Sequence, residues 1–312
     1  MASGDVHLAA LEAGDPSAPS IVLVHGYPDT KELWSGVVER LSPRFHVVAY
    51  DVRGAGGSSA PRRAADYDFR RLGEDLLAVA EALCPGARVH FVGHDWGAIQ
   101  GWEFASDPQF AGLLGSMTAI AGPSLDQAGS SLRELLARRR LGEAVRRLRR
   151  SYYIALLWLP GGPTFIWRAL LDVRRWRAML ARRERVSVPP GYPGPTLPRD
   201  GINGANLYRR NIPRRRALGP RRIEAPVQLI VPDGDRFIPE AHYELAERFA
   251  PSLRRRSVPG SHWAPLADPA LVADLIAQFV ADVESEKDSG ARDRNAEHAA
   301  PTPITRNPHR SA

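Results

Sequence analysis

The chain has 312 residues, of which 44% are hydrophobic and 25% are charged, and its formal net charge is +7. This length fits one large α/β domain with an insertion, and the composition excludes wholesale disorder. A basic chain raises nucleic acid or an anionic membrane as partners, but residues 125–216 alone hold 21 arginines against six acidic residues. The positive charge is therefore concentrated in the middle of the chain, and we expect no nucleic acid partner.

The single cysteine, Cys84, can form no internal disulfide, which favours a reduced setting. Residues 1–13 lack the basic start and apolar stretch of a signal peptide, and the longest apolar run, residues 152–159, is too short to span a bilayer. We therefore expect a cytoplasmic protein.

The first third of the chain alternates between two kinds of pattern. Apolar, β-branched runs at residues 21–24, 45–50 and 89–92 predict buried parallel strands. Apolar residues at helical spacing predict helices over residues 32–41 and 69–83. This alternation predicts an α/β fold with a mostly parallel, doubly wound sheet, to which residues 6–11 add an antiparallel edge strand.

The alternation is interrupted after a further central strand, predicted at residues 114–121. It resumes with strands at residues 227–231 and 254–258 and helices at residues 239–249 and 269–283. The middle is mostly helical in pattern, and residues after 284 are almost free of aliphatic side chains. We therefore predict a core of residues 1–124 and 217–284, an Arg-rich helical cap of residues 125–216, and a disordered tail of residues 285–312.

The most informative motif is Gly93-His94-Asp95-Trp96-Gly97, which joins a predicted strand to a predicted helix. This is the pattern of a nucleophile elbow, in which small residues let strand and helix approach closely and leave the nucleophile's side chain in the open. Because a carboxylate attacks a saturated carbon that carries a leaving group, Asp95 in place of serine favours an epoxide or alkyl halide over an acyl substrate. The alternative is that Asp95 only caps the helix.

A histidine and an acidic residue follow in the order that the hydrolase fold uses. His262 lies in a predicted loop before the final helix, where a general base is expected, and Asp235, after the strand at residues 227–231, would orient it. Asp233 is the rival of Asp235, since either could simply form a turn, and Asp126 is a more distant candidate.

The segment His25-Gly26-Tyr27-Pro28 follows a central strand and can turn sharply, with Pro28 in the cis form. The backbone N–H groups of Tyr27 and Trp96 are the candidate oxyanion hole. We expect His25, Pro28 and Trp263 to line the substrate pocket.

Taken together with Asp51-Val52-Arg53-Gly54-Ala55-Gly56, these motifs resemble the epoxide hydrolase branch of the α/β-hydrolase superfamily, over residues 5–284. The resemblance implies that two cap tyrosines donate hydrogen bonds to the epoxide oxygen. Tyr208 in Asn206-Leu207-Tyr208-Arg209 matches one of them, and Tyr153 matches the other, although Tyr152 is adjacent and the family's usual polar residue nearby is replaced by Trp158 or its apolar neighbours. The chain also resembles the hydrolase portion of larger proteins that carry a C-terminal short-chain dehydrogenase domain, whereas here a tail is predicted.

The expected activity is therefore hydrolysis of a small lipophilic epoxide to a vicinal diol, through an ester on Asp95 and a water activated by His262. No cofactor or metal is expected, because the sequence has no metal-ligand cluster and residues 54–57 lack the spacing of a phosphate loop. A haloalkane or haloacid dehalogenase shares the nucleophile and is the alternative, although Tyr27 and Tyr208 favour the epoxide. A non-catalytic hydrolase-fold binding protein is the third interpretation.

The arginines at positions 138–140, 146–147 and 149–150 precede the apolar run at residues 154–159. One interpretation is a solvated helix surface. The hypothesis we set against it is peripheral contact with an anionic membrane, at which a lipophilic substrate is reached. The sequence sets no oligomeric state.

Overall fold

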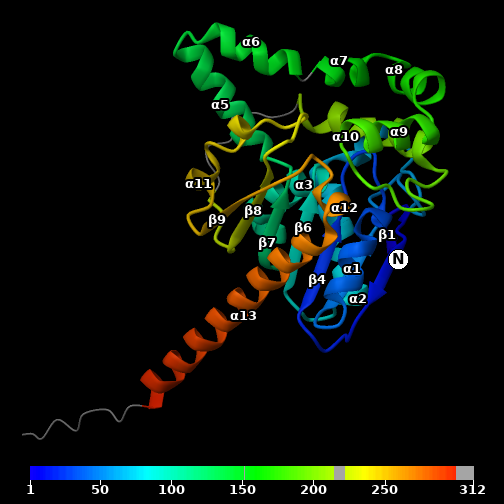
Figure 1. Ribbon diagram of the computed structural model, residues 1–312. Coiled ribbons are helices and arrows are strands. Elements are labelled where there is room, and N and C mark those ends of the chain that lie inside the picture. Colours follow the sequence, from blue (N-terminus) through cyan, green and yellow to red (C-terminus); the bar gives the residue numbers. More distant parts are fainter. Residues whose placement is uncertain (151, 214–221, 300–312) are drawn as a thin grey trace, which may run out of the picture.

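A computed structural model describes residues 1–150, 152–213 and 222–299 of the chain, with the backbone alone at residues 146–150, 152, 288 and 290–299 (Figure 1). A central seven-stranded sheet has the order β3-β5-β4-β6-β7-β8-β9, and all neighbouring strands are parallel except β3 and β5. Its strands are β3 (Ala10–Ala13), β4 (Ser20–Val24), β5 (His46–Tyr50), β6 (Val89–His94), β7 (Leu114–Ile120), β8 (Val227–Pro232) and β9 (Leu253–Val258). The predicted α/β fold with a mostly parallel sheet is confirmed.

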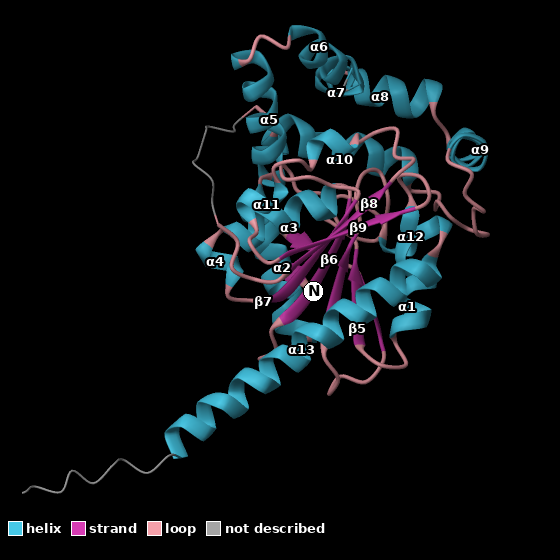
Figure 2. Cartoon of the chain, turned by 60° about the vertical axis from the view of Figure 1, so that its left-hand side comes forward, coloured by secondary structure: helices cyan, strands magenta, loops and turns pink. Residues whose placement is uncertain are grey.

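Helices cover both faces of this sheet, which explains why the five inner strands, β4 to β8, are buried along their whole length, whereas the edge strands β3 and β9 are partly exposed. Alternate residues of each strand enter different cores: Val22 packs with α2 (Phe69–Leu83) and α3 (Trp96–Ser106), and Leu23 packs with α1 (Ser35–Leu41) and α13 (Pro269–Ala299). Figure 2 shows the strands from a second side, with α13 and α1 adjacent. The short elements around the sheet are η1 (Lys31–Trp34), η2 (Ala64–Tyr67), α4 (Pro108–Ala111), η4 (Glu240–His242), α11 (Ala246–Phe249) and α12 (Ala264–Ala267).

A run of helices lies between β7 and β8 in the chain and sits over the carboxyl ends of the strands (Figures 1 and 2). These helices are α5 (Leu125–Ala137), α6 (Leu141–Arg150), α7 (Tyr152–Trp158), α8 (Gly162–Phe165), η3 (Ile166–Leu170), α9 (Val173–Arg183) and α10 (Leu197–Asn211). They fall within the predicted cap, whose proposed end at residue 216 lies outside the described residues. In the part of the chain that the structure describes, no helix is long and apolar enough to cross a membrane.

The N-terminal edge of the sheet differs from the predicted strand at residues 6–11. Residues 2–7 instead form a small separate hairpin, β1 (Ala2–Ser3) with β2 (Val6–His7), which turns at Gly4 with a φ of 61°. The edge strand is therefore β3, in which Ala10 pairs with Tyr50. The turn at Gly4 is what the alternation of apolar residues did not reveal.

Two predicted C-terminal features are wrong in their bounds. The single helix expected over residues 239–249 is two short pieces, η4 and α11, because successive residues bond back three positions, as Tyr243 does to Glu240 and Ala246 to Tyr243.

The tail expected to be disordered from residue 285 is helical as far as Ala299, and residues 300–312 lie outside the described residues. Arg254 of β9 pairs with Asp282 and Glu286, and Lys287 pairs with Glu284. Low hydrophobicity predicted disorder, but these ion pairs hold the helix as far as Lys287.

Candidate active site

The turn between β6 and α3 places Asp95 in a backbone conformation that L residues rarely adopt, with φ 50° and ψ −116°. The glycines on either side permit this. A Cβ atom on Gly93 would lie 2.3 Å from the carbonyl carbon of Gly97, and one on Gly97 would lie 2.0 Å from the carbonyl oxygen of Val24. Strand, helix and the neighbouring β4 therefore meet at distances that only glycine allows, as the elbow motif predicts.

The two carboxylate oxygens of Asp95 have different surroundings. The backbone N–H of Tyr27 donates to Oδ2 at 2.9 Å, and the backbone N–H of Trp96 also stabilises the carboxylate. A Cβ atom on Gly26 would lie 2.6 Å from Oδ2, so glycine is needed for the chain to pass this close. Oδ2 therefore accepts from the backbone N–H of Tyr27, one of the two predicted oxyanion-hole donors, whereas Oδ1 faces His262.

His262 bridges the two acidic residues of the site. Its Nδ1 lies 2.8 Å from Oδ2 of Asp235, and its Nε2 lies 3.9 Å from Oδ1 of Asp95. The other oxygen of Asp235 accepts the backbone N–H groups of Phe237 and Ile238, at 2.8 and 2.9 Å. Asp235 is thus fixed on both oxygens, and it fixes the imidazole in turn.

The rival acids lie elsewhere. Oδ1 of Asp233 accepts the backbone N–H of Gly260 at 3.1 Å, which ties together the two loops that carry Asp235 and His262. Asp126 lies in the first turn of α5 and lines the cavity described below. The geometry therefore assigns the histidine partner to Asp235.

Burial shapes the ionisation of all three groups. It raises the pKa of Asp95 to about 6, although the charge of His262 and the N–H groups of Tyr27 and Trp96 oppose the rise. Burial alone would lower the pKa of His262, but the charge and hydrogen bond of Asp235 and the charge of Asp95 raise it to about 9. Burial also opposes ionisation of Asp235, yet the charge and hydrogen bond of His262 hold its pKa below the ordinary value. Near neutral pH the site therefore holds two carboxylates around an imidazolium.

A second histidine, His94, forms a hydrogen bond to the backbone of His262. His94 is fully buried, and burial, together with the charge of His262, lowers its pKa to about 3. The neutral ring lies 2.8 Å from the backbone carbonyl oxygen of His262 through Nε2, so this nitrogen carries the hydrogen and donates. His94 thereby holds the loop that carries His262.

The cap contributes two tyrosines to the space above Asp95. Tyr208 on α10 is buried, and its ring packs edge-on against Trp96, with centroids 4.7 Å apart, and against Tyr153 on α7, at 6.1 Å. Burial and the charge of Asp95 raise the pKa values of both tyrosines, so their hydroxyls stay protonated as donors. The structure thus brings the two predicted cap tyrosines and the predicted nucleophile to one place.

Asp95 and the two cap tyrosines, Tyr153 and Tyr208, line one cavity of about 660 Å³. Its size suits a small to medium organic molecule. Most of its wall is apolar and comes from α5, α7, α10 and the loop after β8. The residues that line it are Asp95, Trp96, Ile99, Pro123, Leu125, Asp126, Ala128, Gly129, Leu132, Arg133, Tyr153, Ile154, Ala155, Trp158, Tyr208, Ile212, Phe237, Ile238 and His242.

The sequence profile described as "alpha/beta hydrolase fold" matches residues 19–269, which include the elbow, Asp235 and His262. The chain belongs to the α/β-hydrolase fold family. The fold, the position of the elbow and the order of the three residues agree with this assignment.

Curated relatives and solved structures of this hydrolase family extend the comparison. "Probable oxidoreductase EphD" of Mycobacterium tuberculosis is 32% identical over 298 residues, covering 92% of this chain and 50% of that protein. "Epoxide hydrolase 3" of Mus musculus is 26% identical over 295 residues, covering 90% and 76%. The crystal structure of an epoxide hydrolase from Bacillus megaterium with an inhibitor matches with a TM-score of 0.72 and 22% identity, covering 90% of this chain and 99% of that one.

These comparisons confirm the predicted resemblance to the epoxide hydrolase branch. The chain spans about half the length of the EphD relative, in keeping with the expected likeness to a portion of a larger protein.

The predicted pocket residues of this hydrolase differ from the ones observed. His25, Pro28 and Trp263 do not line the cavity at Asp95. The His25 ring bonds to the carbonyl oxygen of Gly26 and accepts the backbone N–H of Val52, so its nitrogens serve the backbone. Pro28 and His25 border a small separate hollow of about 20 Å³. Adjacency in sequence to the oxyanion loop did not predict where these side chains point.

Trp263 instead binds Asp29, a buried residue that the sequence did not single out. Its indole N–H donates to Oδ2 of buried Asp29 at 3.0 Å, and the hydroxyl of Tyr192, from the Pro-rich segment before α10, donates to Oδ1. Burial raises the pKa of Asp29. Asp29 therefore joins the core, the histidine loop and the cap, and its place directly after Pro28 is the signal that could have found it.

Arg209 was also missed, although it stands next to Tyr208 in the quoted motif. Its guanidinium donates to the carbonyl oxygens of Leu157 and Leu159, both at 2.7 Å, at the end of α7. Since α7 carries Tyr153, Arg209 sets the spacing between the helices of the two cap tyrosines.

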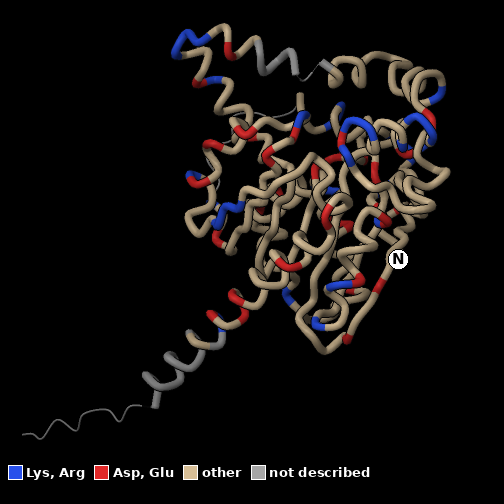
Figure 3. The backbone as a smooth tube through the Cα atoms, viewed as in Figure 1, with Lys and Arg blue, Asp and Glu red and all other residues tan. Residues whose placement is uncertain are grey.

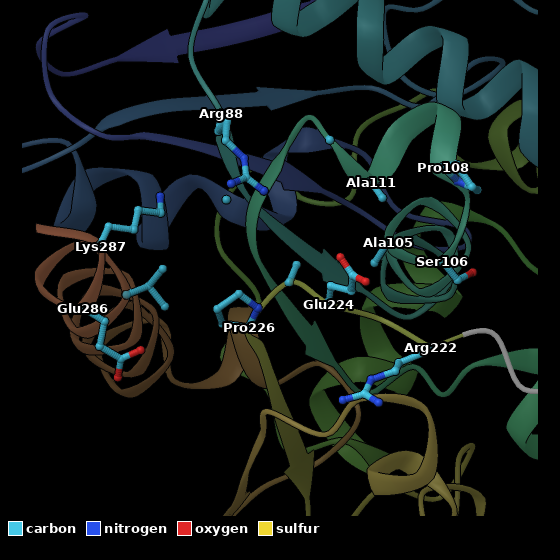
Figure 4. Close-up of a pocket in the computed structure, with 14 residues that line it drawn as sticks. Arg88, Ala105, Ser106, Pro108, Ala111, Arg222, Glu224, Pro226, Glu286 and Lys287 are labelled. Carbon is cyan, nitrogen blue, oxygen red and sulfur yellow. The ribbon is translucent and has the colours of Figure 1, made fainter. Parts of the chain in front are cut away.

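A second cavity, of about 730 Å³, lies at the opposite edge of the sheet, where β6, β7 and β8 begin (Figure 4). Arg88 at its wall donates to the carbonyl oxygen of Leu114, and Glu286 pairs with Arg254. The described residues that line it include no histidine or cysteine. Its chemistry therefore differs from that of the cavity at Asp95, which Tyr153 and Tyr208 also line.

Proposed function

We propose that this protein hydrolyses a small lipophilic epoxide to a vicinal diol through a covalent ester on Asp95. The observation that carries the proposal is the arrangement around one carboxylate. Oδ2 is held by the Tyr27 N–H, Oδ1 faces His262 at 3.9 Å, and two tyrosine hydroxyl-bearing side chains line the same cavity. The apolar wall of that cavity supports a lipophilic substrate.

In the first half of the cycle, Oδ1 of Asp95 attacks an epoxide carbon from the side opposite the ring oxygen. The carbon–oxygen bond of the epoxide breaks, and the oxygen takes a proton from Tyr153 or Tyr208 as its negative charge develops. The product of this step is a hydroxyalkyl ester in which Oδ1 is bonded to substrate carbon and Oδ2 is the carbonyl oxygen.

Ester formation changes the base. The charge of Asp95 is one of the causes that raise the pKa of His262, and the ester no longer carries that charge. The pKa of His262 therefore falls when the ester forms, and the imidazole releases to solvent the proton that it holds in the resting enzyme, while the tyrosine that protonated the epoxide oxygen takes one up. Asp235 keeps the ring oriented throughout.

In the second half, His262 removes a proton from a water molecule that attacks Cγ of Asp95. The negative charge that develops on Oδ2 is stabilised by the N–H groups of Tyr27 and Trp96. As the bond between Cγ and Oδ1 breaks, Oδ1 takes a proton from the imidazolium of His262, and the diol leaves with Oδ1. The water oxygen remains in the carboxyl group of Asp95, which returns its proton to His262 and is a carboxylate again.

This fate of the oxygen atoms gives the test. A single turnover in heavy-oxygen water, with enzyme in excess over styrene oxide or a long-chain terminal epoxide, should place the label in the peptide that contains Asp95 and leave the diol unlabelled. Mass spectrometry of the digested enzyme reads the label. Label in the diol after one turnover would show direct attack by water and exclude the ester.

Dehalogenation of a haloalkane or haloacid is the second candidate, since it uses the same nucleophile. The observation that favours it is Trp96, which lines the cavity next to Asp95 and could bind a leaving halide through its side chain. The tyrosines favour the epoxide, whose oxygen must be protonated when the ring opens. Halide release from alkyl halides without diol formation from epoxides would reverse this order of preference.

A hydrolase-fold protein that only binds its ligand is the third interpretation. The bonded Asp235–His262 pair beside Asp95 supports catalysis instead. If the protein binds epoxides but neither it nor its Asp95→Asn variant turns them over, the binding interpretation replaces ours.

A further inference from the structure

Large hydrophobic side chains are exposed on one part of the cap. Ten such side chains are exposed among the described residues, and eight of them fall between positions 136 and 170. The eight are Leu136, Leu141, Val145, Leu156, Trp158, Leu159, Phe165 and Leu170. Scattered exposed leucines need no explanation, but this concentration on α5 to η3 marks an interaction surface. We call these eight residues the outer cap surface.

The outer cap surface lies at the edge of the molecule. Figures 1 and 2 both show α6, α7 and α8 in a row beyond α10, on the side away from the sheet. The most exposed members are Phe165, at 61%, and Leu141, at 60%. This row of helices therefore carries large apolar side chains that the described part of the protein leaves uncovered.

The charge of this surface is strongly one-sided. The sequence between positions 136 and 170 has eight arginines and one acidic residue, Glu143. Arg138, Arg139, Arg140 and Arg168 are exposed, and Glu143 is paired with Arg140. Figure 3 shows cationic residues toward both ends of the row of helices. The side chains of the other four, Arg146, Arg147, Arg149 and Arg150, lie outside the described part of the structure.

Trp158 connects this surface to the active site. It lines the cavity that holds Asp95, and it is 42% exposed. Helix α7 thus contributes both to the cavity wall, through Tyr153 and Trp158, and to the outer cap surface, through Leu156 and Leu159. Whatever covers the outer cap surface also covers the rim of the cavity at Trp158.

We propose that the outer cap surface docks on the surface of an anionic lipid bilayer, with Trp158, Phe165 and their apolar neighbours in the interface and the arginines on lipid headgroups. Exposed apolar residues with arginines between them match such a boundary, because apolar groups enter the acyl region while arginine side chains extend to the phosphates. Tryptophan is the residue most typical of this depth.

The charge argues for a bilayer over a protein copy or a nucleic acid. Two copies that met through this same surface would bring their arginines together, which is unfavourable. A nucleic acid would match the arginines but would leave Leu141, Phe165 and Leu170 uncovered. A lipophilic epoxide dissolved in the bilayer would then reach the cavity from the side at which Trp158 lies, a consequence that rests on the proposed function.

The tryptophans supply a specific probe. All seven lie within the described residues, and Trp158 alone is exposed. Vesicles of phosphatidylcholine with about 30% phosphatidylglycerol, prepared with brominated acyl chains, should quench the fluorescence of Trp158 on binding. The Trp158→Phe variant should bind the same vesicles in a flotation assay but lose most of this quenching.

Two double variants test the surface. Phe165→Ser with Leu170→Ser removes apolar contact, and Arg138→Gln with Arg168→Gln removes charge; each should weaken flotation with the phosphatidylglycerol vesicles by about tenfold or more. The matched control is Leu11→Ser with Arg62→Gln, one exposed residue of each kind away from the cap, which should bind as the unaltered protein does. Thermal unfolding by circular dichroism establishes that each variant is folded.

The outcomes separate the occupants. Binding that requires phosphatidylglycerol, falls with added salt and is lost in both double variants supports the proposal. Absence of binding, equal binding to phosphatidylcholine alone, or unchanged binding by the double variants overturns it. Concentration-dependent dimerisation that the Phe165→Ser and Leu170→Ser changes abolish, without vesicle binding, assigns the surface to a second copy instead. The Asp95→Asn variant should bind vesicles normally, so a failure of the proposed activity leaves this test intact.

Discussion

The Nε2 atom of His262 lies 3.9 Å from Oδ1 of Asp95, beyond hydrogen-bond distance, while Nδ1 of the same ring bonds to Asp235 at 2.8 Å. The histidine is thus anchored to one carboxylate and faces the other across a gap. In the proposed cycle, this separation leaves Oδ1 free to attack a carbon atom, and it places His262 near the carbonyl carbon that water attacks later. Variants of Asp95 and of Asp235 are therefore expected to affect different steps of the proposed cycle.

The His262→Gln variant should form the ester but fail to hydrolyse it. Asp95 keeps its N–H donors, so alkylation continues, whereas water activation is lost. We expect mass spectrometry to find one equivalent of the hydroxyalkyl ester on the peptide that contains Asp95. The steady-state rate should fall by about 10³-fold or more. The same adduct should be absent from Asp95→Asn, and full turnover by His262→Gln would contradict the role of the base.

The Asp235→Asn variant should lower the hydrolysis rate by about 10³-fold, because the imidazole loses the charge that orients it and raises its pKa. The matched control is Asp233→Asn, two residues away, where the carboxylate accepts a backbone N–H from Gly260. Pre-steady-state measurement of ester decay distinguishes the two. If Asp233→Asn slows ester decay as much as Asp235→Asn does, the assignment of the histidine partner is wrong.

The rate of ester formation should depend on a group with a pKa of about 6. Burial raises the pKa of Asp95 to this value, and only the ionised carboxylate is nucleophilic. Alkylation should therefore fall about tenfold for each pH unit below 6 and level off above it. Rapid-quench measurement of adduct between pH 5 and 8 gives this profile, and a flat profile down to pH 5 would show that Asp95 is ionised well below the expected value.

Tyr208→Phe and Tyr153→Phe should each lower kcat/KM for epoxides by about 10²-fold, and the double variant by more. Both hydroxyl-bearing rings line the cavity with Asp95, and burial keeps them protonated. The control is Tyr50→Phe, whose buried hydroxyl has no hydrogen-bond partner among the described residues. Tyr152→Phe tests the choice between the two adjacent tyrosines: a larger loss there than at Tyr153 would reassign the donor.

The meeting of Asp95, Asp235 and His262 could be predicted because it depends on a local motif and on chain order. Gly93 and Gly97 indicate that the backbone around Asp95 is constrained. The chain order of Asp95, Asp235 and His262 is the order that the hydrolase fold uses. The parallel sheet followed from apolar runs for the same reason, since both faces of β4 and its neighbours are buried.

The rest of the site depends on how the cap packs, which local pattern does not encode. The α5 side of the cavity, at Leu125 and Leu132, is set by packing between elements that periodicity cannot position. His25 and Trp263 were expected in the pocket because their neighbours act there, but hydrogen bonds to Val52 and Asp29 turn their rings into the core. Side-chain direction beside a motif is decided by such distant partners.

The stability of the fold should reveal the cost of ionising Asp95. Its carboxyl has an ordinary pKa of 3.8 when unfolded and about 6 when folded, so the folded state binds the proton more tightly. The contribution of Asp95 to stability is therefore greatest below pH 3.8 and is lost as pH rises through 6. The difference of about two units corresponds to about 3 kcal/mol.

Asp95→Asn, which cannot ionise, should thus raise the free energy of unfolding by up to about 3 kcal/mol at pH 7.5 and by far less near pH 4. Urea unfolding at the two pH values gives the comparison, with Asp233→Asn as a control on an exposed turn. A variant that is less stable than the unaltered protein at pH 7.5 would mean that His262 and the two N–H donors more than repay the burial of this charge. A gain in the free energy of unfolding that is confined to pH 7.5 would instead show that burying the charge of Asp95 destabilises the fold. This is the charge that the proposed chemistry uses for nucleophilic attack.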